Sequence, residues 1–365
     1  MEWYRYSAFR GTLCEQFDEL PSGECEGKRK IISEEQNHWK KDLVPFQQSD
    51  LKKSLWQIVN TVAPYFMLWA AAYWSLSVSY WITLCFVILA AGFAVRMFII
   101  FHDCCHDSFF GNRNANLIVG VFTGLMTFFP YYQWKHEHAM HHATSSNLSR
   151  RGIGDIWTLT VDEYLALSTF RKMGYRLYRN PLIMFGLGPL YLFFVVYRVN
   201  HKRAGRKERW NTYATNLGLA GIVSLLCWWL GWKSVLLIQG PILYLSGIAG
   251  IWLFYVQHQF EETYYEKEDV WNFVSAAMEG SSYYKLPKLL QWMTGNIGFH
   301  HIHHLSSRIP NYYLQQVCQR NAYMHNVSSI DLRTSLRSLR YRVWDEEKKR
   351  FVGFSDLSIR KTEKC

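Results

Sequence analysis

Long parts of the 365-residue sequence lack charged residues. No Asp, Glu, Lys or Arg occurs among the 42 residues from Ser54 to Val95. About 20 apolar residues cross a bilayer, so this run predicts a pair of membrane-spanning helices. A second run, from Trp210 to Phe260, contains Lys233 as its one charged residue, beside a Gly231-Trp232 turn. It predicts a second helical hairpin.

Paired cysteines and a secretion signal are also missing. The eight cysteines have no paired spacing and no CxxC motif, which favours a reducing compartment without disulfides. Residues 1–53 contain no apolar stretch of the kind found at the centre of a signal peptide. The first membrane helix is therefore expected to direct insertion. Residues 1–50 are predicted to form a mobile tail, to which the sequence assigns no function.

The formal net charge is +11, but the basic residues do not form a patch of the nucleic-acid-binding type. They flank the apolar runs instead, with Lys52 and Lys53 before the first hairpin and the basic segment 201–209 before the second. The positive-inside rule then places both termini on the cytoplasmic side of the cell membrane, together with the histidine-rich segments described below. Anionic lipid headgroups are the expected partners of this charge, and nucleic acid is not.

These patterns predict an all-α integral membrane protein, with a single domain over residues 51–365. The expected spanning helices form two hairpins and cover residues 57–76, 80–101, 212–231 and 234–257. The uncharged segments 114–134 and 181–198 are expected to lie in the interface or to re-enter it, because single crossings would separate segments that belong on one side. The cytoplasmic cap then comprises residues 102–113, 135–180 and 258–365, and is predicted to be helical. Arg96 is expected to extend to the lipid headgroups.

Ten of the fourteen histidines lie in three short segments, residues 102–106, 136–142 and 300–304. Positions i, i+3 and i+4 share one face of a helix. Eight histidines fit this spacing and are the predicted metal ligands: His102, His106, His138, His141, His142, His300, His303 and His304. His301 is predicted to point elsewhere and to tolerate replacement.

Four further residues are candidates near the predicted site. His258 ends the last spanning helix and is expected to emerge at the same membrane face as His102, although an ordinary polar role is the alternative. Three residues are candidates to hydrogen-bond the ring nitrogen of a ligating histidine that does not bind the metal, namely Asp155, Asn296 and His136. For Asp155, capping a helix or turn is an equally good interpretation. For His136, which lies off the shared face, the alternative is simple exposure.

Eight imidazoles are too many for one metal ion and suit two. Neutral imidazole binds zinc, copper, iron and nickel, so the ligand type does not select the metal. A structural zinc site uses four ligands, often thiolates, and a transporter would carry polar groups within its spans. A redox metal pair beneath an apolar medium suits oxygen activation against a lipid. Hydroxylation of a lipid, alkane or carotenoid is an alternative, as is a non-enzymatic metal-binding membrane protein.

The series HxxxH, HxxHH and HxxHH between two hairpins resembles the integral-membrane fatty acid desaturases, and the likeness covers nearly all of the chain from about Leu51. It looks closest to bacterial acyl-lipid Δ5 desaturases. The matching stretches are Arg96–His106, His141–Leu148, Gly154–Trp157 and Leu289–Gly298.

The resemblance implies an enzyme with two iron ions, which uses O2 and two electrons to convert a saturated acyl chain of a membrane lipid into one with a cis double bond. It also implies that His258 is a ligand. A heme-binding HPGG motif is absent, so the electrons are expected from a separate donor such as ferredoxin. The Δ5 position rests on the resemblance alone.

Overall fold

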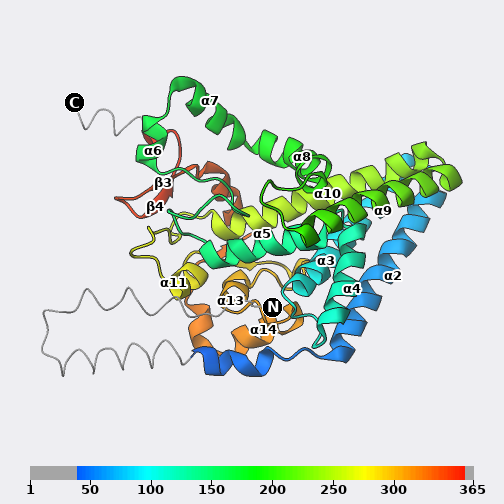
Figure 1. Cartoon of the computed structure of the whole chain (residues 1–365), viewed down its shortest axis with the longest axis horizontal. Helices are drawn as coiled ribbons and strands as arrows, with labels where there is room; N and C mark the ends of the chain where they lie inside the picture. Colours follow the sequence, from blue (N-terminus) through cyan, green and yellow to red (C-terminus); the bar gives the residue numbers. More distant parts are fainter. Residues whose placement is uncertain (1–38, 358–365) are drawn as a thin grey trace, which may run out of the picture. The chain divides into compact units, whose positions relative to one another are not determined.

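The computed structural model describes residues 39–357. The chain divides into two compact units, Met1–Pro45 and Phe46–Cys365. In the first unit, the described residues include one turn of helix at 39–43, and the 3-10 turn η2 (Val44–Phe46) follows. Most of the tail predicted for residues 1–50 lies outside the described residues. Everything below concerns the second unit, in which the long helices lie to the right in Figure 1 and the short C-terminal elements lie to the left and below.

The first predicted hairpin is present as α2 (Leu51–Ser75) and α3 (Tyr80–Cys105). The carboxylate of Asp50 caps α2 by accepting hydrogen bonds from the backbone of Lys52 and Lys53. Small residues such as Ala72 and Ala90 are buried in the core that α2 and α3 share with α10. Helices in a membrane gain contact area in this way, because small side chains let the backbones approach.

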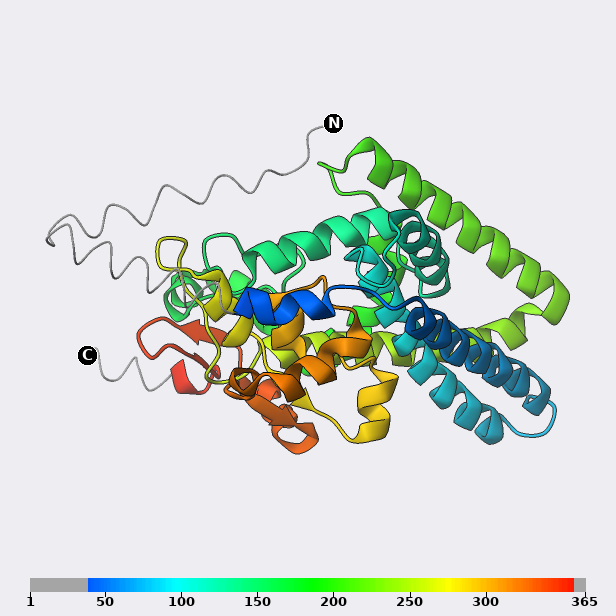
Figure 2. The same ribbon diagram turned by 90° about the horizontal axis from the view of Figure 1, so that it is seen from below.

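Arg96 on α3 does not extend to the headgroups, so that prediction is wrong. Its side chain is buried, Nε donates to Thr61 Oγ1 at 3.1 Å, and Nη1 donates to the carbonyl of Trp292. The guanidinium also lies over the indole of Trp292, 4.0 Å from the ring centroid. Arg96 therefore joins α3 to α12 (Lys288–Met293), and Figure 2 shows α12 beside the hairpin α2–α3.

The second predicted hairpin is present as α9 (Arg206–Leu230) and α10 (Trp232–His258). Gly231 alone separates the two helices, and its φ of 83° lies in the left-handed region that glycine adopts without strain. Helix α9 begins at Arg206, six residues before the predicted span, because the Glu208 carboxylate accepts a hydrogen bond from the backbone N–H of Gly205.

Among the described residues, three helices are long and apolar enough to cross a membrane, namely α3, α9 and α10. Helix α2 has a similar length, but polar residues such as Gln57, Asn60 and Thr61 interrupt its apolar run. Two bent helix pairs would raise the number of possible spans to five if each were one span. The predicted four-span topology thus has direct support for three of its helices.

The two predicted interfacial segments fall on these bent pairs. Helices α4 (Arg113–Met126) and α5 (Tyr131–Thr144) meet at 100°. Helix α7 (Thr169–Tyr178), which follows α6 (Val161–Ala166), meets the segment 182–198 at 57°. That segment contains the π-helical turn η3 (Leu182–Leu187), α8 (Gly188–Phe194) and η4 (Val196–Arg198). The 14 residues of α4 extend about 21 Å, which is less than the thickness of the hydrocarbon core.

The chain after α10 is made of short helices and strands. The helical elements are α11 (Phe273–Met278), α12, α13 (His300–Leu305), α14 (Asn311–Arg320), η5 (Ala322–His325), α15 (Leu332–Ser335) and η6 (Leu336–Arg340). Strand β1 (Tyr283–Lys285) pairs in parallel with β2 (Ser329–Asp331), and β3 (Val343–Asp345) pairs antiparallel with β4 (Arg350–Val352).

The all-α prediction is therefore wrong in detail, although the chain is mostly helical. The error is largest after residue 320, where a helix was expected and strands β2, β3 and β4 occur. Aromatic side chains explain β3 and β4, because Trp344 and Phe351 are buried against Tyr265 and Leu148. β-Branched and aromatic residues favour such extended, packed segments.

Candidate metal centre

The histidine-rich segments converge at one place in the fold. His102 lies in the last turn of α3, and His106 is the residue that ends this helix. Helix α5 carries His138, His141 and His142, and His258 is the last residue of α10. The remaining three ligand candidates, His300, His303 and His304, lie on α13. Helix α3 therefore continues beyond the predicted span, which ends at residue 101, into the first histidine segment. Four helices thus deliver nine imidazoles to one site.

The nine histidines form two groups, and within each group the ring nitrogens lie within 4.8 Å of one another. The first group is His102, His106, His138, His142 and His303. The second group is His141, His258, His300 and His304. Each group has enough nitrogen donors for one metal ion. Helices α5 and α13 each contribute to both groups, whereas α3 serves only the first and α10 only the second.

The ring nitrogens face each other at distances that suit a shared cation. In the first group, His142 Nε2 lies 3.2 Å from His138 Nε2 and 2.9 Å from His303 Nε2. In the second, His300 Nε2 lies 3.0 Å from His258 Nε2 and 3.1 Å from His304 Nε2. Two nitrogens bound to one ion at about 2.1 Å and at right angles would be about 3 Å apart. The donor atoms therefore fit a metal ion in each group.

Burial keeps these imidazoles in the form that binds metal. His300, His303 and His304 are buried, and this burial lowers the pKa of each ring well below the usual value for histidine. Neighbouring histidines lower these pKa values further, because two positive charges so close would repel. The rings are thus neutral at physiological pH, and a lone pair is available without the release of a proton.

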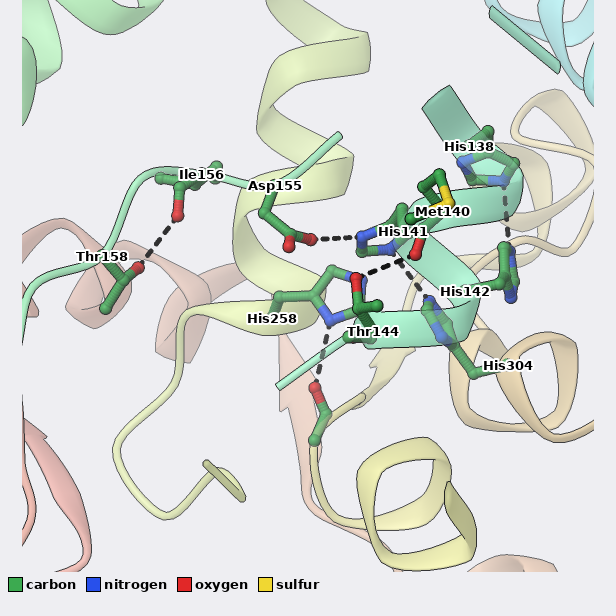
Figure 3. A network of polar contacts seen from close by, with 12 residues as sticks. His138, Met140, His141, His142, Thr144, Asp155, Ile156, Thr158, His258 and His304 are labelled. Carbon is green, nitrogen blue, oxygen red and sulfur yellow. Dashed lines mark hydrogen bonds and ion pairs between the residues drawn. The ribbon is translucent and has the colours of Figure 1, made fainter. Parts of the chain in front are cut away.

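Asp155 contacts a histidine of the second group, as the sequence suggested. Its Oδ1 lies 2.5 Å from His141 Nδ1, and Figure 3 shows the carboxylate directed at the ring. The preceding Gly154 has a φ of 71°, and a Cβ there would lie 2.7 Å from the carbonyl oxygen of Glu137. A side chain at position 154 would therefore push Asp155 away from α5. The carboxylate orients the imidazole so that Nε2 faces the other donors.

The first group has an equivalent carboxylate that the sequence analysis missed. Asp103 Oδ1 lies 2.9 Å from His102 Nδ1. Its Oδ2 accepts hydrogen bonds from both the backbone and the side-chain nitrogen of Asn311, at 2.7 and 2.8 Å. Gln57 Nε2 in turn donates to Asn311 Oδ1 at 3.1 Å. This buried network joins α2, α3 and α14, and no local pattern in the sequence indicates it.

His258 takes its orientation from the backbone. Its Nδ1 lies 3.0 Å from the carbonyl oxygen of Gly280, which accepts the ring N–H and leaves Nε2 for His300. A Cβ at position 280 would lie 2.4 Å from both the carbonyl oxygen of Ala276 and Ser146 Oγ. The close packing of Gly280 therefore fixes the acceptor of His258.

Two of the predicted supporting residues do not contact the groups. The side chain of His136 is 57% exposed, and its nearest charged partner is Glu208, with Nδ1 and Oε1 3.6 Å apart. Within the described residues it joins neither group, so the expected contact with a ligand is wrong because residue 136 lies on the outer face of α5. Asn296 donates from Nδ2 to the carbonyl oxygen of Asn311 at 3.3 Å. Its side chain is therefore linked to the first group through Asn311 and Asp103.

His301 points away from both groups, as predicted, but it is fully buried. Its Nε2 lies 3.1 Å from the carbonyl oxygen of Met324. We expect His301→Ala to destabilise the protein by about 1–3 kcal/mol, because a buried carbonyl loses its donor. Bound metal and activity per folded molecule should stay unchanged. Thermal unfolding combined with metal analysis checks this, and loss of metal from folded His301→Ala would place the residue in the site.

Two aromatic rings flank the groups, one helical turn before a histidine in each case. Trp134 on α5 stacks on His138 with centroids 4.2 Å apart, and Phe254 on α10 lies 5.0 Å from His141. Such rings exclude water from the nitrogen donors and leave an apolar surface beside each group. Nine histidines, six of them buried, thus lie in two groups that could each hold a metal ion beside apolar helices, an arrangement typical of a metal-binding membrane protein.

Comparisons with known proteins identify the family. Residues 78–330 match the family described as fatty acid desaturase. The chain is 55% identical to a fatty acid desaturase of Bacillus subtilis (strain 168) over 325 residues, which cover 89% of this chain and 92% of that protein. This protein belongs to the fatty acid desaturase family and is an oxidoreductase, as the sequence predicted.

More distant relatives are named for lipid-bound substrates. The sn-1 oleoyl-lipid 12-desaturase of Anabaena variabilis is 23% identical over 67% of this chain and 70% of its own length. The sn-1 acyl-lipid omega-3 desaturase (ferredoxin) of Nostoc sp. (strain 36) is 26% identical over 60% and 61% respectively. The double-bond positions in these two names differ from each other and from Δ5.

Proposed function

We propose that this protein introduces a cis double bond into the saturated acyl chains of membrane lipids, at the Δ5 position. The observation that carries the proposal is the arrangement of nine histidines, six of them buried, in two groups beside apolar helices. Membership of the family supports the reaction, and the relatives named for acyl lipids support a lipid-bound substrate. The Δ5 position is supported by the likeness of the histidine-rich stretches alone.

The proposed cofactor is a pair of iron ions. His102, His106, His138, His142 and His303 would hold one ion, and His141, His258, His300 and His304 would hold the other. With O2 and two electrons, bound iron supplies an oxidant for an unactivated C–H bond, which side chains cannot provide. Asp103 and Asp155 hold one imidazole of each group in the orientation that directs Nε2 inward. Trp134 and Phe254 keep water from the same nitrogens.

The proposed membrane placement uses α2, α3, α9 and α10 as four spans of one desaturase domain, residues 51–365. The bent segments 114–134 and 181–198 lie in the interface, and the remaining parts form the cap on the cytoplasmic side. The basic residues between η4 and α9 support this orientation. Electrons would come from a separate donor such as ferredoxin, which the name of the Nostoc relative also mentions.

A reporter fused after Arg209 tests the orientation. The fusion point precedes the apolar part of α9 and follows the basic segment 201–209, so we expect a cytoplasmic signal. A second fusion at Gly231, between α9 and α10, should report the opposite side. The same signal from both fusions would contradict the proposal that α9 and α10 span the membrane as a hairpin.

The fatty acid profile of an expressing host tests the reaction. We expect monounsaturated acyl chains with a cis Δ5 bond in the lipid fraction, identified by gas chromatography and mass spectrometry of derivatives that mark the bond position. Hydroxylated chains without monoenes would instead establish a hydroxylase. Monoenes at another position would retain the reaction and overturn Δ5.

A further inference from the structure

A groove of about 250 Å³ lies between the segment α8–η4 and helix α9. From α9 it is lined by Asn216, Leu219, Ala220 and Val223, which follow the spacing i, i+3, i+4 and i+7 of one helical face. Opposite this face lie Phe193 and Phe194 of α8. The walls are almost wholly apolar, and the polar atoms gather at the Asn216 end.

The position of the groove on α9 fits the boundary between headgroups and hydrocarbon. Only 11% of the apolar window of α9 is buried, so most of this helix faces the surrounding medium. Trp210 and Tyr213 are exposed and precede Asn216 by less than two helical turns. Exposed Trp and Tyr at the start of an apolar helix are typical of the headgroup level. From Asn216 to Val223 the groove then extends toward the hydrocarbon.

One cation lines the groove. Arg198 Nη1 donates to Asn216 Oδ1 at 2.7 Å, and Nη2 donates to the carbonyl oxygen of Phe128 at 2.5 Å. These bonds use two of the five guanidinium N–H donors. Arg198 Nε is buried and has no hydrogen-bond partner within residues 39–357. A cation with spare donors at the end of an apolar groove is complementary to an acyl chain that carries a phosphate.

We propose that this groove binds one acyl chain of a phospholipid, with the lipid phosphate paired to Arg198. The proposal rests on the membrane placement of α9 and is independent of the reaction. Phe128, which Arg198 holds, has a φ of 69° at the 100° bend between α4 and α5. Phe193 contacts both Phe128 and Phe129. A bound phospholipid would therefore stabilise the bend from which α5 carries its three histidines.

The test compares the thermal stability of the purified full chain with two added lipids, phosphatidylglycerol and diacylglycerol with the same acyl chains. Ala220→Trp fills the groove, and Ala214→Trp places the same ring on another exposed position of α9 as a matched control. We expect phosphatidylglycerol to raise the Tm of the wild type and of Ala214→Trp by about 2–4 °C. Ala220→Trp should show no such rise, and diacylglycerol should have a smaller effect on all three.

An equal rise for both tryptophan variants would overturn the proposal and place the lipid elsewhere, for example at the basic segment 201–209. Diacylglycerol as effective as phosphatidylglycerol would overturn the pairing with Arg198. A photoreactive phosphatidylglycerol provides a second measurement on the wild type. Label within residues 193–198 or 216–223 supports the groove, and label only outside these two ranges, including the basic segment 201–209, overturns it. Neither measurement uses turnover. The groove can therefore be confirmed in a protein that makes no monoene, and it can be overturned in an active desaturase.

Discussion

Replacing His304 by alanine is expected to abolish double-bond formation and to lower the bound iron from about two ions per chain to about one. His304 Nε2 lies 3.1 Å from His300 and 3.3 Å from His141, at the centre of the second group. Its loss leaves three nitrogens there and a gap between them. Activity should fall by more than about 100-fold, because removal of a ligand costs more than removal of its supporting contact. Elemental analysis and the lipid profile of the same preparation measure both effects.

The matched control is His136→Ala, which removes an exposed imidazole from the same helix as three of the ligands. We expect it to keep both ions and full activity. His303→Ala should instead lose the ion of the first group. A wild-type protein with a single zinc ion at full occupancy would contradict the two-ion site. Equal activity in His304→Ala and His136→Ala would contradict the assignment of His304.

We expect Asp103→Asn and Asp155→Asn each to lower the affinity for one metal ion by about 10–100-fold and to leave the affinity for the other unchanged. Asparagine has nearly the same shape, but it lacks the negative charge that orients the ring and stabilises it when a cation binds. Asp103→Asn should release iron from the first group at a lower chelator concentration, and Asp155→Asn from the second. Titration with a chelator, followed by the fraction of iron retained, measures this.

Asp107→Asn is the control for these two variants. Asp107 follows α3, and its carboxylate pairs with Lys135 at 2.9 Å on the partly exposed surface. Such a pair contributes between about 0 and 1 kcal/mol, so iron release should follow the wild-type curve. If all three variants released iron alike, the effect would come from net charge, and Asp103 and Asp155 would have no specific contact with the metal site.

The sequence predicted the parts of this site that depend on local spacing. The i, i+3 and i+4 histidines follow from the helical repeat and the two hairpins from the uncharged runs, and His258 follows from its place at the end of a hairpin. The division of the histidines into two groups could not be predicted, because it depends on how α5 and α13 are rotated against α3 and α10. The contact between Asp103 and Asn311 joins residues 208 positions apart, which no local pattern encodes.

The errors have physical causes of the same kind. Arg96 looked like a snorkelling residue because its acceptors, Thr61 and the carbonyl of Trp292, come from distant segments. The helical face of His301 likewise gives no sign of its buried contact with Met324, whose carbonyl oxygen lies 3.1 Å from His301 Nε2. Strands β3 and β4 were missed because three residues are too few for a period of two to be detected.

Helices α5 and α13 each hold histidines of both groups, and this has a consequence for biosynthesis. α13 is the last of the four contributing helices to leave the ribosome, so neither group has its full set of donors until both hairpins have been inserted. At about 5–20 residues per second, His300 follows His106 by about 10–40 seconds. During that interval the incomplete donor set is open to whichever metal is abundant. Correct loading therefore depends on the completion of α13, and a chain truncated before residue 300 should lose both ions together.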